Sequence, residues 1–161
     1  MSYPKVRNLI KDSFKALVKE KFPEADLIVG VATAGIAHGA LLADALDLPF
    51  AYIRSKAKGH GMQNLIEGKI KAGAKVIVVE DLISTGGSSL KGVDAVREAG
   101  AEVLTMLAIF TYGFDHAEQN FADKDCSFYT LSDFDNLLKF AIDNSLFPKE
   151  ELAFMADWKK Q

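Results

Sequence analysis

The sequence predicts an α/β protein with a mainly parallel central sheet and helices on both faces. The clearest sign is the uninterrupted apolar run Val-Ile-Val-Val at residues 76–79, which is typical of a strand buried on both sides. Further runs of this kind alternate with stretches of helical periodicity, as in β-α-β units. Glycine-containing turns at 32–35 and 84–88 lead from a strand into a helix, and sheets of this class bind ligands at such turns.

The first half of the chain predicts two helices and two strands. Residues 4–22 form an amphipathic helix, since apolar side chains recur at spacings of three and four and Phe22-Pro23 ends it. Residues 27–31 and 50–53 are short apolar runs and are expected to be strands. Between them, the turn 32–35 is expected to open a helix that ends at Leu46.

The second half predicts further alternation of strands and helices. Residues 63–68 indicate a short strand or hairpin arm before the central strand, and Gly100 is expected at the C′ position of the helix that follows it. The expected helices are 90–99, 117–121, 134–142 and 150–159, and the expected strands are 103–110 and 128–131.

The length and composition are those of a single domain and give no sign of a nucleic-acid-binding or membrane protein. A chain of 161 residues can bury one sizeable core, so we expect one domain spanning 1–161. The net charge is −3 with acids and bases interspersed, which gives no reason to expect a nucleic-acid or membrane partner. The single cysteine, Cys126, and the lack of a signal-peptide pattern or of a run of about 18 apolar residues favour a cytoplasmic protein.

Two adjacent acids, Glu80 and Asp81, follow the central strand, and a turn rich in glycine and hydroxyl groups follows them at 84–88. Such a turn beside a helix N-terminus exposes backbone N–H groups that suit a phosphate monoester. The acids can accept hydrogen bonds from neighbouring sugar hydroxyls, or hold Mg²⁺ directly or through water. The stretch therefore predicts a ribose 5-phosphate site, the alternative being a solvated acidic turn that caps a helix.

A basic run follows the predicted strand 50–53. Arg54, Lys56, Lys58 and His60 place four potential cations in seven positions beside glycines. The simpler interpretation is a solvated basic loop. The functional one is a partner for a departing anion such as pyrophosphate, for which the turn 32–35 could provide a second phosphate site.

The motif at 80–88 resembles the phosphoribosyl pyrophosphate (PRPP) binding motif of the type I phosphoribosyltransferases. The run 54–61 resembles the mobile catalytic loop of the orotate phosphoribosyltransferase family, in which the spacing Arg, three residues, Lys, one residue, His, Gly recurs. The resemblance implies the type I fold, Mg²⁺ as cofactor, and Lys58, Arg54, His60 and Asp81 as catalytic side chains. The residues it implies for PRPP binding are Thr33, Ala34, Gly35, Arg54, Lys58, His60, Glu80, Asp81, Leu82, Ile83, Ser84, Thr85, Gly86, Gly87 and Ser88.

The same resemblance implies a reaction and a partner. PRPP and orotate would give orotidine 5′-monophosphate and pyrophosphate in pyrimidine (UMP) biosynthesis, in a homodimer whose catalytic loop reaches the neighbouring subunit's site. Glu80 and Asp81 would meet the metal indirectly, through substrate or water. Ser84 and Tyr112 are the candidates for contacting orotate.

The chain departs from the family pattern in three places. Ser55 stands where some members carry Lys, and Tyr112 lies in a stretch where some place an Arg for the base carboxylate. The family also has an N-terminal segment that forms a hood over the base. We expect this segment to be missing here, through truncation or loss. Two other functions therefore stay open: a phosphoribosyltransferase for another base, or a catalytically weak PRPP-binding regulator.

Overall fold

The computed structural model describes residues 1–55, 65–148, 151, 154–155 and 158, and contains six strands and five helices within them. The strands are β1 (Leu27–Val31), β2 (Phe50–Ile53), β3 (Ile66–Glu67), β4 (Lys75–Ile83), β5 (Glu102–Thr111) and β6 (Phe128–Asp133). The helices are α1 (Pro4–Lys21), α2 (Ala34–Leu46), α3 (Gly87–Glu98), α4 (Asp115–Asp123) and α5 (Phe134–Asp143).

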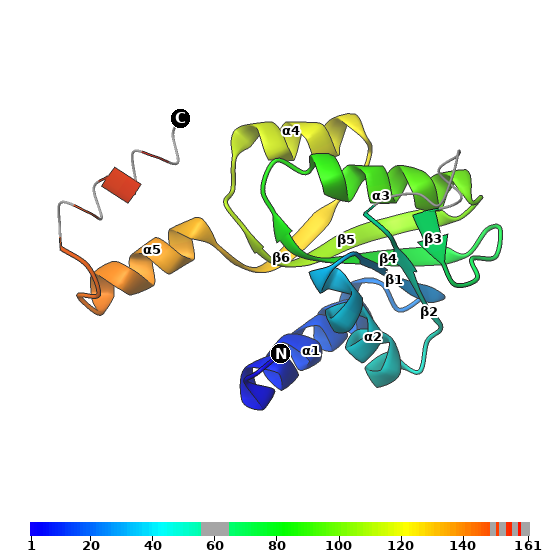
Figure 1. The fold of residues 1–161 in the computed structure, drawn as a ribbon, viewed down its shortest axis with the longest axis horizontal. Coiled ribbons are helices and arrows are strands. Elements are labelled where there is room, and N and C mark those ends of the chain that lie inside the picture. The colour runs from blue at the N-terminus through cyan, green and yellow to red at the C-terminus, as the bar shows by residue number, and fades with distance from the viewer. Residues whose placement is uncertain (56–64, 149–150, 152–153, 156–157, 159–161) are drawn as a thin grey trace.

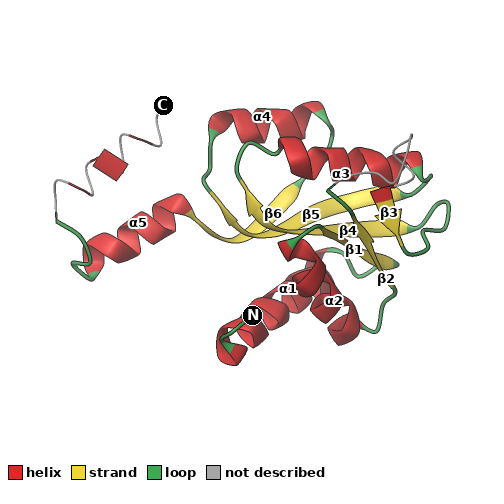
Figure 2. Ribbon diagram, in the orientation of Figure 1, coloured by secondary structure: helices red, strands yellow, loops and turns green. Residues whose placement is uncertain are grey.

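The strands form a single sheet in the order β3-β2-β1-β4-β5-β6. All neighbouring strands are parallel except β2 and β3, which are antiparallel. Helices α1 and α2 cover one face and α3 and α4 the other (Figures 1 and 2). This arrangement confirms the predicted fold class.

Both faces of the central strands are buried, which is why their sequences show no polar alternation. Along β4, Val76 and Val78 belong to the apolar cluster beneath α3 and α4, whereas Ile77 and Val79 belong to the cluster beneath α1 and α2. Helix α1 contributes Phe14 to the second cluster, where its side chain is fully buried. The sheet thus lies between two apolar layers, and the loops that join its strands to the helices lie at the strand ends.

The predicted boundaries agree with the structure to within a few residues, with three informative differences. The central strand runs on through both acids to Ile83, because β5 continues beside it and pairs with it as far as Thr111. Helix α3 begins at Gly87, inside the predicted turn, and Gly100 has the left-handed φ of 85° expected at C′. The hairpin arm is reduced to two residues, and most of the predicted helix 150–159 lies outside the described residues.

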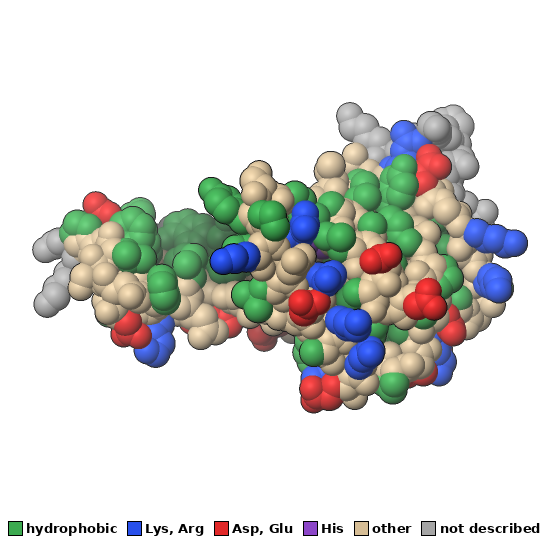
Figure 3. Space-filling view, turned by 90° about the horizontal axis from the view of Figure 1, so that it is seen from below, with side chains coloured by type: hydrophobic (Ala, Val, Ile, Leu, Met, Phe, Trp, Pro, Cys, Tyr) green, Lys and Arg blue, Asp and Glu red, His purple; other side chains and the backbone are tan. Residues whose placement is uncertain are grey.

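The face covered by α1 and α2 carries acidic and basic side chains interspersed (Figure 3). Helix α5 projects beyond β6 and away from the sheet (Figure 1), and apolar side chains remain exposed on it and just after it, including Leu137, Phe140 and Phe147. Within the described part of the chain, none of the helices combines the length and the apolar character needed to span a bilayer.

Candidate active site

A cavity of about 460 Å³ opens at the carboxyl ends of β1 and β4, the two central strands of the sheet. Because these strands are parallel neighbours, the turns that follow them lie at the same edge, and α2 and α3 both point their N-termini toward it. The lining residues are Ala32, Thr33, Ala34, Glu80, Asp81, Leu82, Ser84, Thr85, Gly86, Ser88 and Ser89.

The two acids follow Val79, the last residue of β4 that pairs with β1. Glu80 is 6% exposed, and its carboxylate accepts hydrogen bonds from the Asp81 backbone N–H at 3.0 Å and from the Ser89 hydroxyl at 3.4 Å. Burial, together with the neighbouring Asp81, raises the pKa of Glu80 to about 8. Asp81 is partly exposed in the same cavity, so it is the carboxylate more open to a bound molecule.

The turn after β4 presents backbone N–H groups to the cavity edge. Gly86 precedes α3 with a left-handed φ of 83°, a conformation that favours glycine. The Leu90 N–H donates to the Gly86 carbonyl at 2.8 Å, so the N–H groups just before it precede the first turn of hydrogen bonds within α3. The first N–H groups of a helix have no partner within the helix, and together with the hydroxyls of Ser84, Thr85 and Ser88 they suit an anion such as a phosphate group.

The turn after β1 lies against the backbone of β4. A Cβ atom at Gly35 would approach the Val79 carbonyl oxygen to 2.4 Å, so glycine allows α2 to touch β4 directly. The peptide bond between Ala32 and Thr33 is cis. The close approach brings Thr33 and Ala34 into the cavity opposite the two acids.

The cavity brings together nine of the residues predicted to contact PRPP: Thr33, Ala34, Glu80, Asp81, Leu82, Ser84, Thr85, Gly86 and Ser88. Gly35 serves the packing described above, the Ile83 side chain is fully buried in the core, and Gly87 is the exposed first residue of α3. Lys58 and His60 lie outside the described residues.

Arg54 follows β2 at the same edge of the sheet as the cavity. Its guanidinium Nη1 donates to the Glu67 carboxylate at 3.0 Å, and the two side chains are 30% and 40% exposed. An ion pair this exposed contributes little to stability, so Arg54 can exchange Glu67 for another anion at low cost.

Tyr112 lies outside the acid-lined cavity, in an aromatic cluster at the end of β5. Its ring stacks on Phe114 at 5.6 Å and meets the edge of Trp158 at 5.6 Å. It also lines an apolar cavity of about 520 Å³ formed mainly by α5 and the segment after it. These contacts agree with the interpretation of Tyr112 as a packing aromatic, and its place at the end of β5 leaves the base contact as a proposal.

Two other residues considered from the sequence have buried or half-buried positions. His38 on α2 is half-buried. Its pKa is lowered, mainly by burial and then by the positive chain terminus, while Asp81 acts in the opposite direction. Cys126 is buried and unpaired, and burial raises its pKa to about 11, so its thiol is a core group with little thiolate at neutral pH.

Two lining residues are absent from the predicted PRPP contacts: Ala32, the first residue of the predicted turn 32–35, and Ser89, which follows the motif at 80–88. A weaker signal was present, because Ser89 is the second of two serines at the start of α3. Asn120 on α4, whose amide donates to the Thr85 carbonyl at 2.9 Å, was not predicted either. No local pattern marks Asn120, since it lies 35 residues further along the chain.

A second large cavity, of about 550 Å³, lies at the opposite edge of the sheet, near Asp26, Lys69 and Lys71. Its lysines could attract an anion, but it has neither paired acids nor a turn between strand and helix, so it lacks the combination of groups that suits a ribose together with its phosphate. Among the described residues, no cluster of three or more His, Cys, Asp or Glu side chains is arranged to hold a metal ion by itself.

Comparison with known proteins identifies the family of this chain. Residues 2–141 match the model of the phosphoribosyl transferase domain. The orotate phosphoribosyltransferase of Cytophaga hutchinsonii is 51% identical over 160 residues, which is 99% of this chain and 77% of that protein. The chain belongs to the orotate phosphoribosyltransferase family.

Solved structures of phosphoribosyltransferases share the fold. The orotate phosphoribosyltransferase of Aeropyrum pernix superposes with a TM-score of 0.77 at 27% identity, over 86% of this chain and 77% of that one. The adenine phosphoribosyltransferase of Saccharomyces cerevisiae superposes with a TM-score of 0.68 at 30% identity, over 81% of this chain and 80% of that one. The expectation of a type I phosphoribosyltransferase fold is confirmed. Since enzymes with different bases share this fold, the overall architecture does not select the base.

Proposed function

We propose that this chain carries out the reaction of the orotate phosphoribosyltransferases. It transfers the phosphoribosyl group of PRPP to orotate and forms orotidine 5′-monophosphate and pyrophosphate in pyrimidine biosynthesis. The observation that carries the proposal is the cavity in which paired acids and a hydroxyl-rich turn face a second small-residue turn. The high identity to the Cytophaga hutchinsonii protein over almost the whole chain supports orotate as the base.

The proposed roles follow the chemistry of each group. The turn Ser84–Ser88 holds the 5′-phosphate, and Glu80 and Asp81 accept hydrogen bonds from the ribose hydroxyls. Thr33–Gly35 and the cations Arg54, Lys58 and His60 serve the pyrophosphate group. Ser84, which lines the cavity, and Tyr112, which follows β5 at the same edge, are the proposed contacts for orotate.

The transition state explains why cations are needed. As the bond to pyrophosphate lengthens, positive charge develops on the ribose ring and negative charge on the departing oxygens. Arg54 and Lys58 stabilise the departing oxygens more strongly in the transition state than in the ground state, and the nearby Asp81 carboxylate favours the positive ring. No protein base is needed for orotate, whose N1 is acidic enough for its anion to act as the nucleophile.

The oxygen donors at the cavity suit Mg²⁺ as a cofactor. Magnesium prefers hard oxygen ligands and is commonly held by one or two carboxylates together with substrate phosphates and water. Asp81 is partly exposed in the cavity, whereas both oxygens of Glu80 already accept hydrogen bonds. We therefore assign the metal contact mainly to Asp81, through substrate or water. When bound, the ion neutralises charge on the pyrophosphate group.

The proposal includes a homodimer in the cytoplasm, with the basic segment 54–61 of each subunit reaching the other subunit's site. A shared site makes catalysis depend on association, so the specific activity should fall on dilution below the dimer dissociation constant. Sedimentation velocity at matching concentrations measures that constant independently.

The direct test is an assay of pyrophosphate release from PRPP and Mg²⁺ with orotate, uracil, hypoxanthine or xanthine. We expect release with orotate to exceed release with each other base by at least about a hundredfold, since a site that pairs with a carboxylate and ring oxygens rejects bases lacking them. Release with a purine instead would assign another base. PRPP binding without release with any base would indicate a regulator and contradict the proposal.

A further inference from the structure

One side chain from outside the motif 80–88 contacts the proposed phosphate turn. Asn120 lies on α4, which covers the same face of the sheet as α3 (Figure 1), and its amide Nδ2 donates to the Thr85 carbonyl at 2.9 Å. The assignment of the amide atoms follows from chemistry, because a carbonyl only accepts and the NH₂ group must therefore face it. Asn120 is exposed and is not among the residues that line the cavity.

This contact sets the direction of a backbone donor. The peptide unit between Thr85 and Gly86 is trans and planar, so its C=O and N–H groups point in opposite directions. Because the Thr85 carbonyl is bonded to Asn120 on α4, a trans peptide unit directs the Gly86 N–H away from Asn120, and Gly86 itself lines the cavity. Gly86 has a φ of 83°, and a glycine backbone has little intrinsic preference among conformations. A hydrogen bond from another element therefore has a large effect on the orientation of the peptide unit before Gly86.

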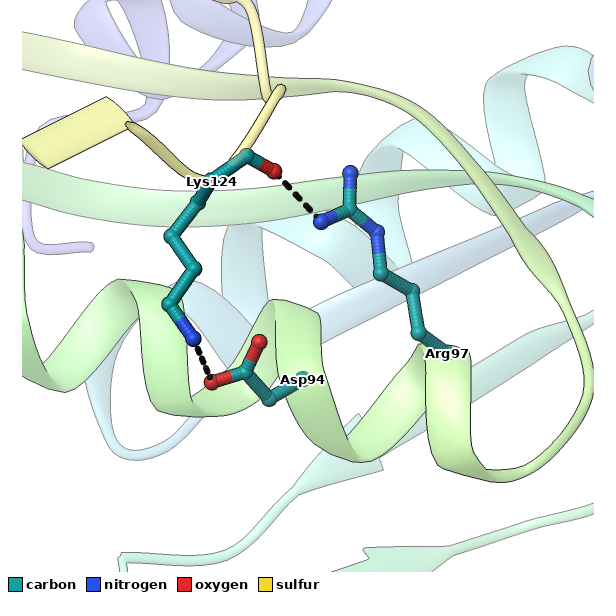
Figure 4. Close-up of polar contacts among 3 residues, drawn as sticks. All are labelled: Asp94, Arg97 and Lys124. Atoms are coloured by element: carbon teal, nitrogen blue, oxygen red, sulfur yellow. Dashed lines mark hydrogen bonds and ion pairs between the residues drawn. The ribbon is translucent and has the colours of Figure 1, made fainter. Parts of the chain in front are cut away.

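Helix α4 is held firmly enough to act as a support. Phe121, the residue after Asn120, is 1% exposed, and a Cβ atom at Gly86 would approach its ring to 2.7 Å. At the end of α4, Arg97 on α3 donates to the carbonyls of Lys124 at 2.6 Å and Asp125 at 2.7 Å. Figure 4 shows the first of these contacts beside the ion pair between Lys124 and Asp94, which measures 2.7 Å.

We propose that Asn120 is a positioning residue for binding of the 5′-phosphate end of PRPP, acting through the orientation of the Gly86 N–H. The inference rests on the proposed function, because it requires the turn 84–88 to hold a phosphate group. A donor pre-oriented by the folded protein binds an anion more tightly, since the peptide unit loses no freedom on binding. Removing Asn120 lets this unit rotate and weakens the site without removing any group that touches the ligand.

The test compares Asn120→Ala with Gln119→Ala. Gln119 is the neighbouring exposed amide on α4, and its side chain donates to Asp123 of the same helix at 2.7 Å rather than to the turn. Calorimetry measures the affinity for ribose 5-phosphate and for pyrophosphate in one magnesium-containing buffer. We expect N120A to lose about tenfold in affinity for ribose 5-phosphate and to keep its affinity for pyrophosphate, while Q119A matches the wild type for both.

Asn120→Asp provides a second variant, because it keeps the shape of the side chain but has no N–H donor when ionised. It should also lose affinity for ribose 5-phosphate. In the orotate assay, both Asn120 variants should raise KM for PRPP with a smaller change in kcat, the pattern of lost binding.

Three results would overturn the inference: wild-type affinity of either Asn120 variant for ribose 5-phosphate, an equal loss for ribose 5-phosphate and pyrophosphate in N120A, or a matching loss in Q119A. A wild-type protein that binds neither compound would instead refute the PRPP site itself, and the inference with it.

Discussion

The Glu80 carboxyl is nearly buried and lies next to a second carboxyl, Asp81. Burial removes water that would stabilise the charged form, and the adjacent acid adds repulsion, so both raise the pKa, to about 8. At neutral pH the ligand-free cavity therefore carries less negative charge than two acids suggest. This lowers the repulsion that a phosphorylated sugar meets when it enters.

The raised pKa of Glu80 makes stability depend on pH. The unfolded chain releases this proton near pH 4.5 and the folded chain near pH 8, so between these values the folded state binds more protons and the free energy of unfolding falls as pH rises. Glu80→Gln removes this dependence. Relative to wild type, the variant should therefore gain stability steadily from pH 5 to pH 8 in urea unfolding without metal or ligand.

Glu98→Gln makes the same substitution at an exposed position of α3 and serves as the control. If the stability difference between E80Q and wild type stays constant across this pH range, the assignment of a raised pKa to Glu80 is wrong.

Among the secondary-structure elements, the cavity forms where two strand-turn-helix units lie side by side. β1 with α2 and β4 with α3 are each a strand, a small-residue turn and a helix, and the two strands are parallel neighbours. Two helix N-termini therefore meet at one edge, which suits a ligand with a phosphate group at each end, as in PRPP. β2 ends at the same edge and carries Arg54 there.

The approach of α2 to β4 depends on Gly35. Gly35→Ala places a methyl group 2.4 Å from the Val79 carbonyl oxygen, and neither backbone can move without disturbing the sheet. We expect a loss of about 1–3 kcal/mol in the free energy of unfolding, measured by urea denaturation.

Gly87→Ala is the matched control for Gly35→Ala, because the new methyl group would lie 3.9 Å from its nearest neighbour at the first position of α3. It should change stability by less than about 0.5 kcal/mol. Equal stabilities for the two variants would contradict the close packing of α2 on β4.

At the scale of the whole molecule, distant segments meet beside the carboxyl end of β5. Trp158, near the end of the chain, lies 5.5 Å from Phe114 and 5.6 Å from both Tyr112 and Phe134, measured between ring centroids. Aromatic pairs at this separation stabilise one another beyond the area they bury. The cluster thus connects the C-terminal segment to the strand end that borders the proposed base site.

The single tryptophan reports on this connection. Tyr112→Ala removes one of the rings around Trp158 and should shift its fluorescence emission to longer wavelength and increase quenching by acrylamide, because the indole becomes more exposed to water. Tyr129→Ala, which removes a ring that packs on Phe22 instead, should leave the emission unchanged. Unchanged emission in Y112A would show that Trp158 does not pack there in solution.

Most of the strands and helices could be predicted because their signals are local. The uninterrupted apolar run of β4 indicates a buried strand, and the spacing of apolar residues in α1 indicates a helix. The predicted strand ended at Val79 because acidic side chains are rarely found within a strand that is buried on both faces. The structure extends it to Ile83, since pairing with β5 provides hydrogen bonds that no local pattern reveals.

The strands, the helices and the chemistry of the phosphate turn were predictable from local sequence, since the acids, hydroxyls and glycines that define the turn are contiguous. The groups that surround this turn depend on the packing of distant segments: the turn containing Thr33 follows the adjacent strand, the Ser89 hydroxyl donates to the Glu80 carboxylate, and the Asn120 amide donates to the Thr85 carbonyl. The difference arises because periodicity specifies which face of an element is buried, whereas strand order and helix packing specify what lies against that face.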